Sequence, residues 1–244
     1  DDKVKYGLDI SGFKTEFEYF NSVNRRINQT QFTTQIAGYG RYKKVLGDFV
    51  LDPSVRLQYY ASVQEFLVEP RLGIKYNITD YLRFKGAAGL YSQNLMSARS
   101  ERDVVNLFYG FLSAPDDLPN EFNGNPVTSR LQKAQHAIAG FEADISRNIS
   151  LELEGYFKDF TQLTDVNRNK IFEDRPDNQD KPARLREDFI VETGEAYGID
   201  FNAKYDKKPF YFWVVYSLGF NERFTGRMSY DPHWDRRHNL NILG

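Results

Sequence analysis

The stretch SLELEGYFKDF, residues 150–160, alternates apolar and polar side chains at every second position. Leu151 and Leu153 share one parity, and Glu152 and Glu154 share the other. A period of two is that of a β-strand, whose successive side chains point to opposite faces of a sheet. The stretch therefore predicts a strand with one apolar face and one polar face.

The same period recurs along the whole chain, with no linker composition and no sign of a second domain. The sequence, 1–244, is therefore predicted to be one all-β segment of about ten strands. The predicted strands are 3–20, 31–44, 49–60, 68–77, 81–92, 135–145, 150–160, 195–205, 210–220 and 238–244.

The connections between these strands alternate between long and short. The short ones are 45–48, 77–80, 146–149 and 206–209, and the intervening ones are longer and polar. Short turns at one end and long loops at the other are typical of an antiparallel up-and-down transmembrane β-barrel. Most of the strands also reach the roughly 9–11 residues that cross a bilayer when tilted. A soluble sandwich would show the same alternation within each strand, but has no reason to keep this order of loops.

Composition excludes several other classes. The 244 residues carry a net charge of −2, so no basic field indicates nucleic acid as a partner. There is no cysteine, which excludes disulfides, thiolate nucleophiles and cysteine-ligated metals. No apolar run approaches the roughly 18 residues of a membrane helix, and the N-terminal stretch does not resemble a signal peptide. Aromatic residues make up 16% of the chain and gather beside the short turns, where an interfacial girdle would lie.

The last strand, with the residues before it, suggests a family. YDPHWDRRHNLNILG (230–244) resembles the Asp-Arg-Arg-His strand signature of TonB-dependent outer-membrane receptors, in the branch found in Bacteroidetes-type bacteria. The stretches 68–95, 149–172 and 194–206 resemble other barrel strands of that family, in the expected order. The resemblance covers nearly the whole chain. It implies a barrel of roughly 22 strands around a plug, with the plug domain and the closing C-terminal strands outside this chain.

The resemblance also implies a function and partners. A member of this family imports a nutrient ligand actively across the bacterial outer membrane, and is neither an enzyme nor dependent on a cofactor. Its expected partners are outer-membrane lipid, a TonB-type periplasmic energiser acting through the plug, a small-molecule, glycan or peptide ligand, and a surface lipoprotein. Two alternatives stay open: a small ten-stranded barrel that closes on itself as a porin or rim-site protease, and a soluble carbohydrate-binding β-sandwich.

On the barrel interpretation, the polar parity of the strands faces the lumen. Glu69 and Arg71 are expected to lie near Arg83 and Lys85 as oppositely charged cross-strand neighbours that line the wall. The residues predicted to face the lumen are Glu69, Arg71, Lys75, Arg83, Lys85, Glu152, Glu154, Arg237 and Asn239.

The loop 93–134 supplies the candidates for ligand contact. Phe108, Tyr109 and Phe111 are apolar groups within a polar loop and could form an aromatic surface over the barrel mouth. Packing against a neighbouring loop is the alternative.

Two further patterns in the sequence could indicate functional sites. Asp165, Asn167 and Asn169 have the alternate spacing of calcium loops, but Lys170 and Pro176 stand where glycine and glutamate are required. We therefore expect a solvated loop and no metal.

His238 and Asp235 could form an acid/base pair. Polar packing at the end of a strand is the favoured interpretation, and no catalytic residue is predicted.

Overall fold

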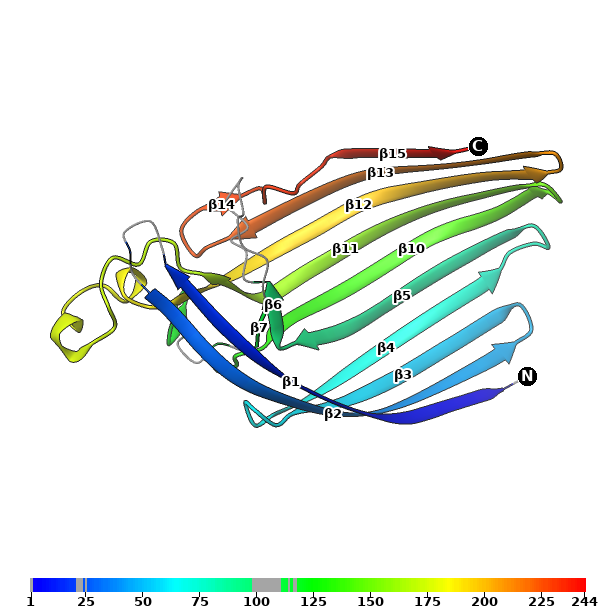
Figure 1. Ribbon diagram of the computed structural model, residues 1–244. Helices are drawn as coiled ribbons and strands as arrows, with labels where there is room; N and C mark the ends of the chain where they lie inside the picture. Colours follow the sequence, from blue (N-terminus) through cyan, green and yellow to red (C-terminus); the bar gives the residue numbers. More distant parts are fainter. Residues whose placement is uncertain (1, 21–23, 25, 98–110, 114, 116–117) are drawn as a thin grey trace.

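The computed structural model describes residues 2–20, 24, 26–97, 111–113, 115 and 118–244. Long antiparallel strands form one curved sheet, drawn side by side in Figure 1. The long strands are β1 (Lys3–Phe20), β2 (Arg26–Leu46), β3 (Phe49–Tyr60), β4 (Glu65–Asn77), β5 (Leu82–Gln93), β10 (Gln132–Ser146), β11 (Ile149–Val166), β12 (Phe189–Lys207) and β13 (Phe210–Phe224), followed by the shorter β15 (His238–Leu243).

Short elements lie in the longer connections between these strands. They are β6 (Leu95–Ser97), β7 (Phe111–Ser113), β8 (Glu121–Phe122), β9 (Asn125–Pro126) and β14 (Ser229–Tyr230), with two helical turns, η1 (Pro176–Asn178) and η2 (Ala183–Leu185). In the part of the chain that the structure describes, no helix is long and apolar enough to cross a membrane.

The sheet is a meander in which each long strand pairs with the next one along the chain. Its order is β1-β2-β3-β4-β5-β10-β11-β12-β13-β14, and β15 also pairs with β13. All ten predicted strands form, which confirms the antiparallel up-and-down prediction. Within the described sheet β1 and β15 do not pair with each other, so the alternative of ten strands closing on themselves is wrong.

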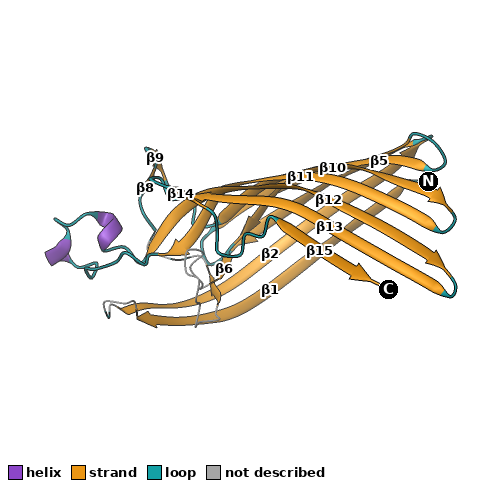
Figure 2. Cartoon of the chain, turned by 90° about the horizontal axis from the view of Figure 1, so that it is seen from above, coloured by secondary structure: helices purple, strands orange, loops and turns teal. Residues whose placement is uncertain are grey.

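The turns 47–48, 78–81, 147–148 and 208–209 lie at one end of the sheet, as Figure 2 shows. At the opposite end the β3–β4 connection, 61–64, is shorter than predicted, because β4 begins at Glu65. The β2–β3 turn has Gly47 at a φ of +60°, a left-handed conformation that glycine adopts at little cost. Phe49, directly after this turn, lies opposite Tyr76 of β4, and the two rings stack with centroids 4.3 Å apart. Tyr81 and Phe210 are exposed near the neighbouring turns.

The two faces of the sheet differ as the alternation predicts. The convex face is apolar and open, with Leu8 84%, Leu72 49% and Ile199 50% exposed. Among the residues that the structure describes, no second layer covers this face, so the β-sandwich alternative, which buries its apolar faces, is wrong.

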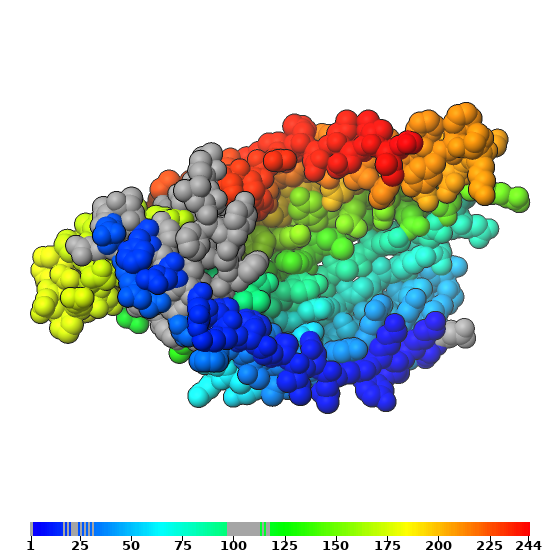
Figure 3. Space-filling model, viewed as in Figure 1, coloured from blue at the N-terminus to red at the C-terminus, as the bar shows by residue number. Residues whose placement is uncertain are grey.

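The polar face is the concave one. The β6–β7 hairpin contacts β1 and β2 through β7 and contacts β11 through β6. Thr15 Oγ1, on the polar parity of β1, lies 3.0 Å from Ser113 Oγ of β7. A hairpin can reach strands so far apart in the sheet only from its concave side. Figure 3 shows this face hollowed between β1, in blue, and β15, in red.

Pro70 interrupts the ladder between β4 and β5. The pairing runs from Asn77 opposite Arg83 to Arg71 opposite Gly89 and stops there, because proline has no N–H to donate. Beyond that point Ser92 donates its backbone N–H to Glu69 Oε1 instead, at 2.8 Å. A carboxylate thus replaces the lost ladder partner.

Beyond this break the loop that leads into β10 packs against the sheet. Leu131 is fully buried there against Tyr60, with Val63 and Leu67 packed around them. Glu65 holds the same loop, because its carboxylate accepts Ser129 Oγ at 2.6 Å and the backbone N–H of Arg130 at 2.9 Å.

Candidate functional site: the concave face

Near the short turns, the concave face carries a group of oppositely charged side chains that pair with one another. Arg83 of β5 contacts Glu142 of β10 at 3.0 Å and also pairs with Asp144. Lys85 pairs with Glu142 and lies 3.8 Å from Glu152 of β11. We call these five residues the paired wall. On β2 and β3 the same face carries further ion pairs, from Arg41 to Asp52 and from Arg56 to Asp9.

The expected grouping of Glu69 and Arg71 with Arg83 and Lys85 is wrong. The register places Arg71 opposite Gly89, and Arg83 and Lys85 lie toward the short turns. Arg83 and Lys85 find their carboxylates on the following strands instead. Lys75, which lies opposite Lys85, shares the polar face but gains no carboxylate across the ladder.

Glu69 centres a second polar group next to the Pro70 break. Its side chain is buried and accepts Arg71 Nη2 at 2.7 Å and Ser92 Oγ at 2.5 Å. Tyr60 Oη lies 2.9 Å from the same Ser92 hydroxyl. The Arg71 guanidinium lies 4.4 Å from the ring centroid of Tyr91, so the group continues into the aromatic side chains of β5.

Farther along the face, toward β12, the wall opens into a hollow of about 440 Å³. Its lining residues are Ala87, Ala88, Tyr91, His136, Ile138, Glu154, Tyr156, Lys158 and Asp200. The rings of Tyr91 and His136 stack with centroids 4.5 Å apart and form one side. Glu154 and Asp200 lie directly opposite each other on β11 and β12.

Glycines shape the floor of the hollow. A Cβ on Gly198 would lie 2.7 Å from Tyr156 Oη, and one on Gly219 would lie 2.9 Å from it. The phenol therefore lies against the backbone of β12 and β13, where only glycine leaves room for it.

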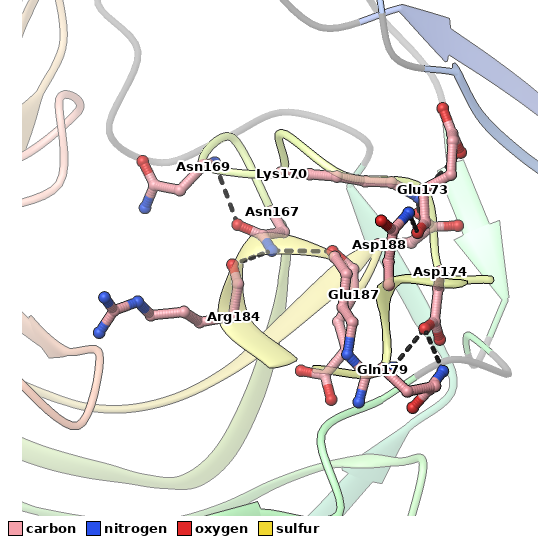
Figure 4. Close-up of polar contacts among 11 residues, drawn as sticks. Asn167, Asn169, Lys170, Glu173, Asp174, Gln179, Arg184, Glu187 and Asp188 are labelled. Atoms are coloured by element: carbon pink, nitrogen blue, oxygen red, sulfur yellow. Dashed lines mark hydrogen bonds and ion pairs between the residues drawn. The ribbon is translucent and has the colours of Figure 1, made fainter. Parts of the chain in front are cut away.

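The loop between β11 and β12 is held by polar contacts (Figure 4). Asn167 Nδ2 donates to the carbonyl oxygens of Arg184 and Glu187, each at 2.8 Å. Lys170 is buried and pairs with Asp188 and, at 3.6 Å, with Glu173. These contacts define the shape of a loop that the sequence predicted only as solvated.

The calcium candidates lie at the base of this loop. Asp165 Oδ1 accepts the backbone N–H of Val166 at 2.7 Å, and Asn167 Oδ1 accepts that of Asn169 at 3.0 Å. Among the described residues, no group of three or more His, Asp or Glu side chains is arranged to hold a metal ion. The expectation that no metal binds stays a prediction.

A buried carboxylate at the long-loop end was missed by the sequence analysis. Glu192 of β12 is fully buried, accepts Tyr230 Oη at 2.8 Å and lies 3.7 Å from Arg223 Nη1. Burial, followed by the nearby negative charge of Glu192, raises the pKa of Tyr230 above its ordinary value. The alternation alone gives no signal for this site, because the β11 register shifts between Phe160 and Leu163.

The C-terminal charge cluster does not form an acid/base pair. His238 Nδ1 lies 2.8 Å from Tyr216 Oη. Asp235 instead accepts Asn221 Nδ2 at 2.9 Å and pairs with Arg237 Nε at 3.1 Å. The two side chains therefore have different partners.

Arg237 directly precedes β15, and Asn239 lies within it. Asn239 lies opposite Ser217 on the polar face, as predicted. The Arg237 guanidinium lies 4.6 Å from the ring centroid of Phe220 and 2.9 Å from Asp231, so it contributes to the rim of the sheet.

Of the ligand-contact candidates, Phe108 and Tyr109 lie outside the described residues. Phe111 begins β7, where its backbone is opposite Ser97 of β6. Their role in ligand contact stays a prediction.

Solved structures share this fold, while no protein-family model and no curated protein matches the chain. The FrpB iron transporter from Neisseria meningitidis aligns with a TM-score of 0.57 at 12% identity, over 96% of this chain and 34% of its own. The alcaligin outer-membrane receptor FauA from Bordetella pertussis aligns with a TM-score of 0.52 at 14% identity, over 99% of this chain and 43% of its own. FpvAI, in its complex with pyocin S2, aligns with a TM-score of 0.54 at 11% identity, over 89% of this chain and 25% of its own.

The chain thus spans well under half the length of these proteins. Their likeness confirms, at the level of fold, the resemblance to outer-membrane receptor barrels that the sequence suggested. It also shows that an open sheet of this kind corresponds to part of a larger barrel wall.

Proposed function

We propose that this chain forms part of the barrel wall of a TonB-dependent receptor in a bacterial outer membrane, and that the whole protein imports a nutrient ligand. One observation carries the proposal: the meander has an open apolar convex face and a charged concave face, with its two-residue turns at one end. That division suits a wall between lipid and an aqueous lumen.

The convex face supports a lipid environment. Large apolar side chains are exposed over every long strand, from Leu8 on β1 to Phe212 on β13. Soluble monomers rarely expose a continuous apolar surface above a few hundred Å². Lipid covers such a surface without a protein partner.

The ends of the strands fit two different roles. The aromatic side chains beside the short turns would lie at the periplasmic interface. The long loops, including the polar loop 167–188, would face outward and capture the ligand. The plug, the periplasmic energiser and a surface lipoprotein belong to the proposed whole protein, and the ligand is a small molecule, glycan or peptide. No enzymatic activity is proposed.

The orientation of the wall is tested by one pair of variants in the full-length protein. Leu153→Arg places a cation on the convex face of β11, near the centre of the roughly 9–11 residues after the short turn that would cross a bilayer. It is expected to cost about 2–4 kcal/mol of folding free energy in a bilayer. Glu152→Arg, one residue away on the concave face, leaves the convex face apolar. The folded fraction in lipid vesicles, read from heat-modifiable electrophoretic mobility, measures both.

Equal tolerance of both arginines would contradict a lipid-facing convex surface. Import itself is tested by comparing ligand uptake in a deletion strain and in the same strain complemented with the gene, with and without a proton uncoupler. Uptake that persists in the deletion strain, or that ignores the uncoupler, would remove energised import from the proposal.

A further inference from the structure

The hollow differs from the rest of the concave face in its charges. Glu154 and Asp200 face each other across the β11–β12 ladder, and neither has a hydrogen bond or ion pair to any described residue. Two carboxylates directly opposite each other repel and are unfavourable in a sheet. Elsewhere on this face, Arg83, Lys85, Arg41 and Arg56 all have carboxylate partners.

The missing cation has a structural reason. The rung that carries Glu154 and Asp200 continues to Gly140 on β10 and then to Lys85 on β5. Gly140 offers no side chain, and a Cβ there would lie 2.4 Å from the carbonyl oxygen of Leu153. Lys85 is engaged by Glu142 on the side of the short turns. The rung itself therefore carries no cation next to Glu154, and Lys158, which also lines the hollow, makes no ion pair with either carboxylate.

Aromatic groups surround the two carboxylates. Tyr156 lies two residues farther toward the loops, and its hydroxyl end lies against Gly198 and Gly219. The ammonium of Lys158 lies 5.3 Å from the centroid of that ring, so the ring already attracts a cation. On the other side, the stacked His136 has a buried Nε2 with no hydrogen-bond partner among the described residues.

We propose that this hollow is a binding subsite for an ammonium or guanidinium group on a ligand that moves along the concave face. Two half-buried carboxylates supply charge-assisted hydrogen bonds to such a group. The ring of Tyr156 supplies an aromatic face that attracts the cation, and the unpartnered His136 nitrogen supplies a further polar contact. The hollow has room for a side chain of this size. The proposal rests on the proposed function, because it needs the concave face to be a passage.

The test uses the full-length protein in detergent and two matched probes. L-arginine amide carries a guanidinium, and L-citrulline amide has the same shape with a neutral urea. Calorimetric titration at low ionic strength is expected to show arginine amide binding at least tenfold more tightly. The double variant Glu154→Gln/Asp200→Asn is expected to lose that preference at least tenfold. Glu152→Gln, on the same strand and face but beside Lys85, is expected to change it by less than twofold.

Equal binding of the two probes, or a preference that survives in the double variant, would overturn the subsite. A third outcome also overturns it: no probe binds the wild type, and the double variant melts at a lower temperature. That result would assign the cation to another part of the same protein. Membrane fractionation of the same preparations tests the proposed function separately, since a protein recovered outside the membrane would defeat the transporter whatever the titration shows.

Discussion

Two carboxylates on one strand show how differently neighbouring parts of this wall are built. Glu152 lies 3.8 Å from Lys85 and 3.5 Å from Asn202 Nδ2, whereas Glu154, two residues farther on the same face, has neither kind of partner. The alternation of β11 treats the two alike. What separates them is the residue on the neighbouring strand: Glu142 lies opposite Glu152 and brings in cations, and Gly140 lies opposite Glu154. The charges of the paired wall thus neutralise one another, whereas the two carboxylates of the hollow stay unpaired.

The largest effect is expected from filling the floor of the hollow. Gly198→Ala would place a Cβ 2.4 Å from the carbonyl oxygen of Leu218 and 2.7 Å from Tyr156 Oη. Because a backbone atom must move, we expect a loss of about 3 kcal/mol, at the upper end for overpacking. Urea unfolding in lipid vesicles measures it.

Gly155→Ala is the matched control for this substitution. Gly155 lies within the neighbouring strand β11, but its nearest neighbours would be 3.8 and 3.9 Å from an added Cβ. A similar loss in both variants would mean that any glycine in these strands is needed, and the hollow would lose its special floor.

A charge exchange tests the comparison directly. Arg83→Gln leaves Glu142 and Asp144 without their shared cation, and we expect a loss of about 1–2 kcal/mol because the site is half-buried and partly screened. Glu154→Gln removes one of two repelling carboxylates and is expected to leave stability unchanged or to raise it by a few tenths of a kcal/mol.

The same unfolding measurement reads both variants. Should Glu154→Gln destabilise the protein as much as Arg83→Gln, Glu154 would have to be a structural member of the wall, and the contrast between the two regions would fail.

The sequence predicted the strands because most of them repeat a period of two over ten or more residues. It predicted the faces for the same reason. Pairing across strands was less accessible: Glu69 and Arg83 share the concave face, but the register places them several rungs apart. Register depends on Pro70, the turns and the shifts in β10 and β11, which alternation within a single strand does not encode.

The hollow was visible only in part. Glu154 was predicted to face the lumen, but Tyr156, Lys158, His136 and Asp200 were not singled out as a group. These residues come together because of the order of the strands in the sheet and because Gly198 and Gly219 leave room for the Tyr156 hydroxyl. Glu192 was missed altogether, because a buried acid has no distinct pattern in one sequence and its partner Tyr230 lies 38 residues away.

The smallest expected loss of stability concerns a third carboxylate, Glu192. Glu192 is buried like a member of a core and is satisfied by Tyr230, so it contrasts with Glu154, which is half-buried and unpartnered. Tyr230→Phe removes one hydrogen bond while Arg223 remains at 3.7 Å, and we expect a loss of about 1 kcal/mol at neutral pH. Because the pKa of Tyr230 is raised in the folded protein, its contribution is complete below the ordinary tyrosine pKa of about 10 and is lost as pH rises above that value. The stability difference between wild type and Tyr230→Phe should therefore shrink between pH 9 and pH 11. A difference that stays constant over that range would show that Tyr230 gains no protonation-dependent stability from Glu192.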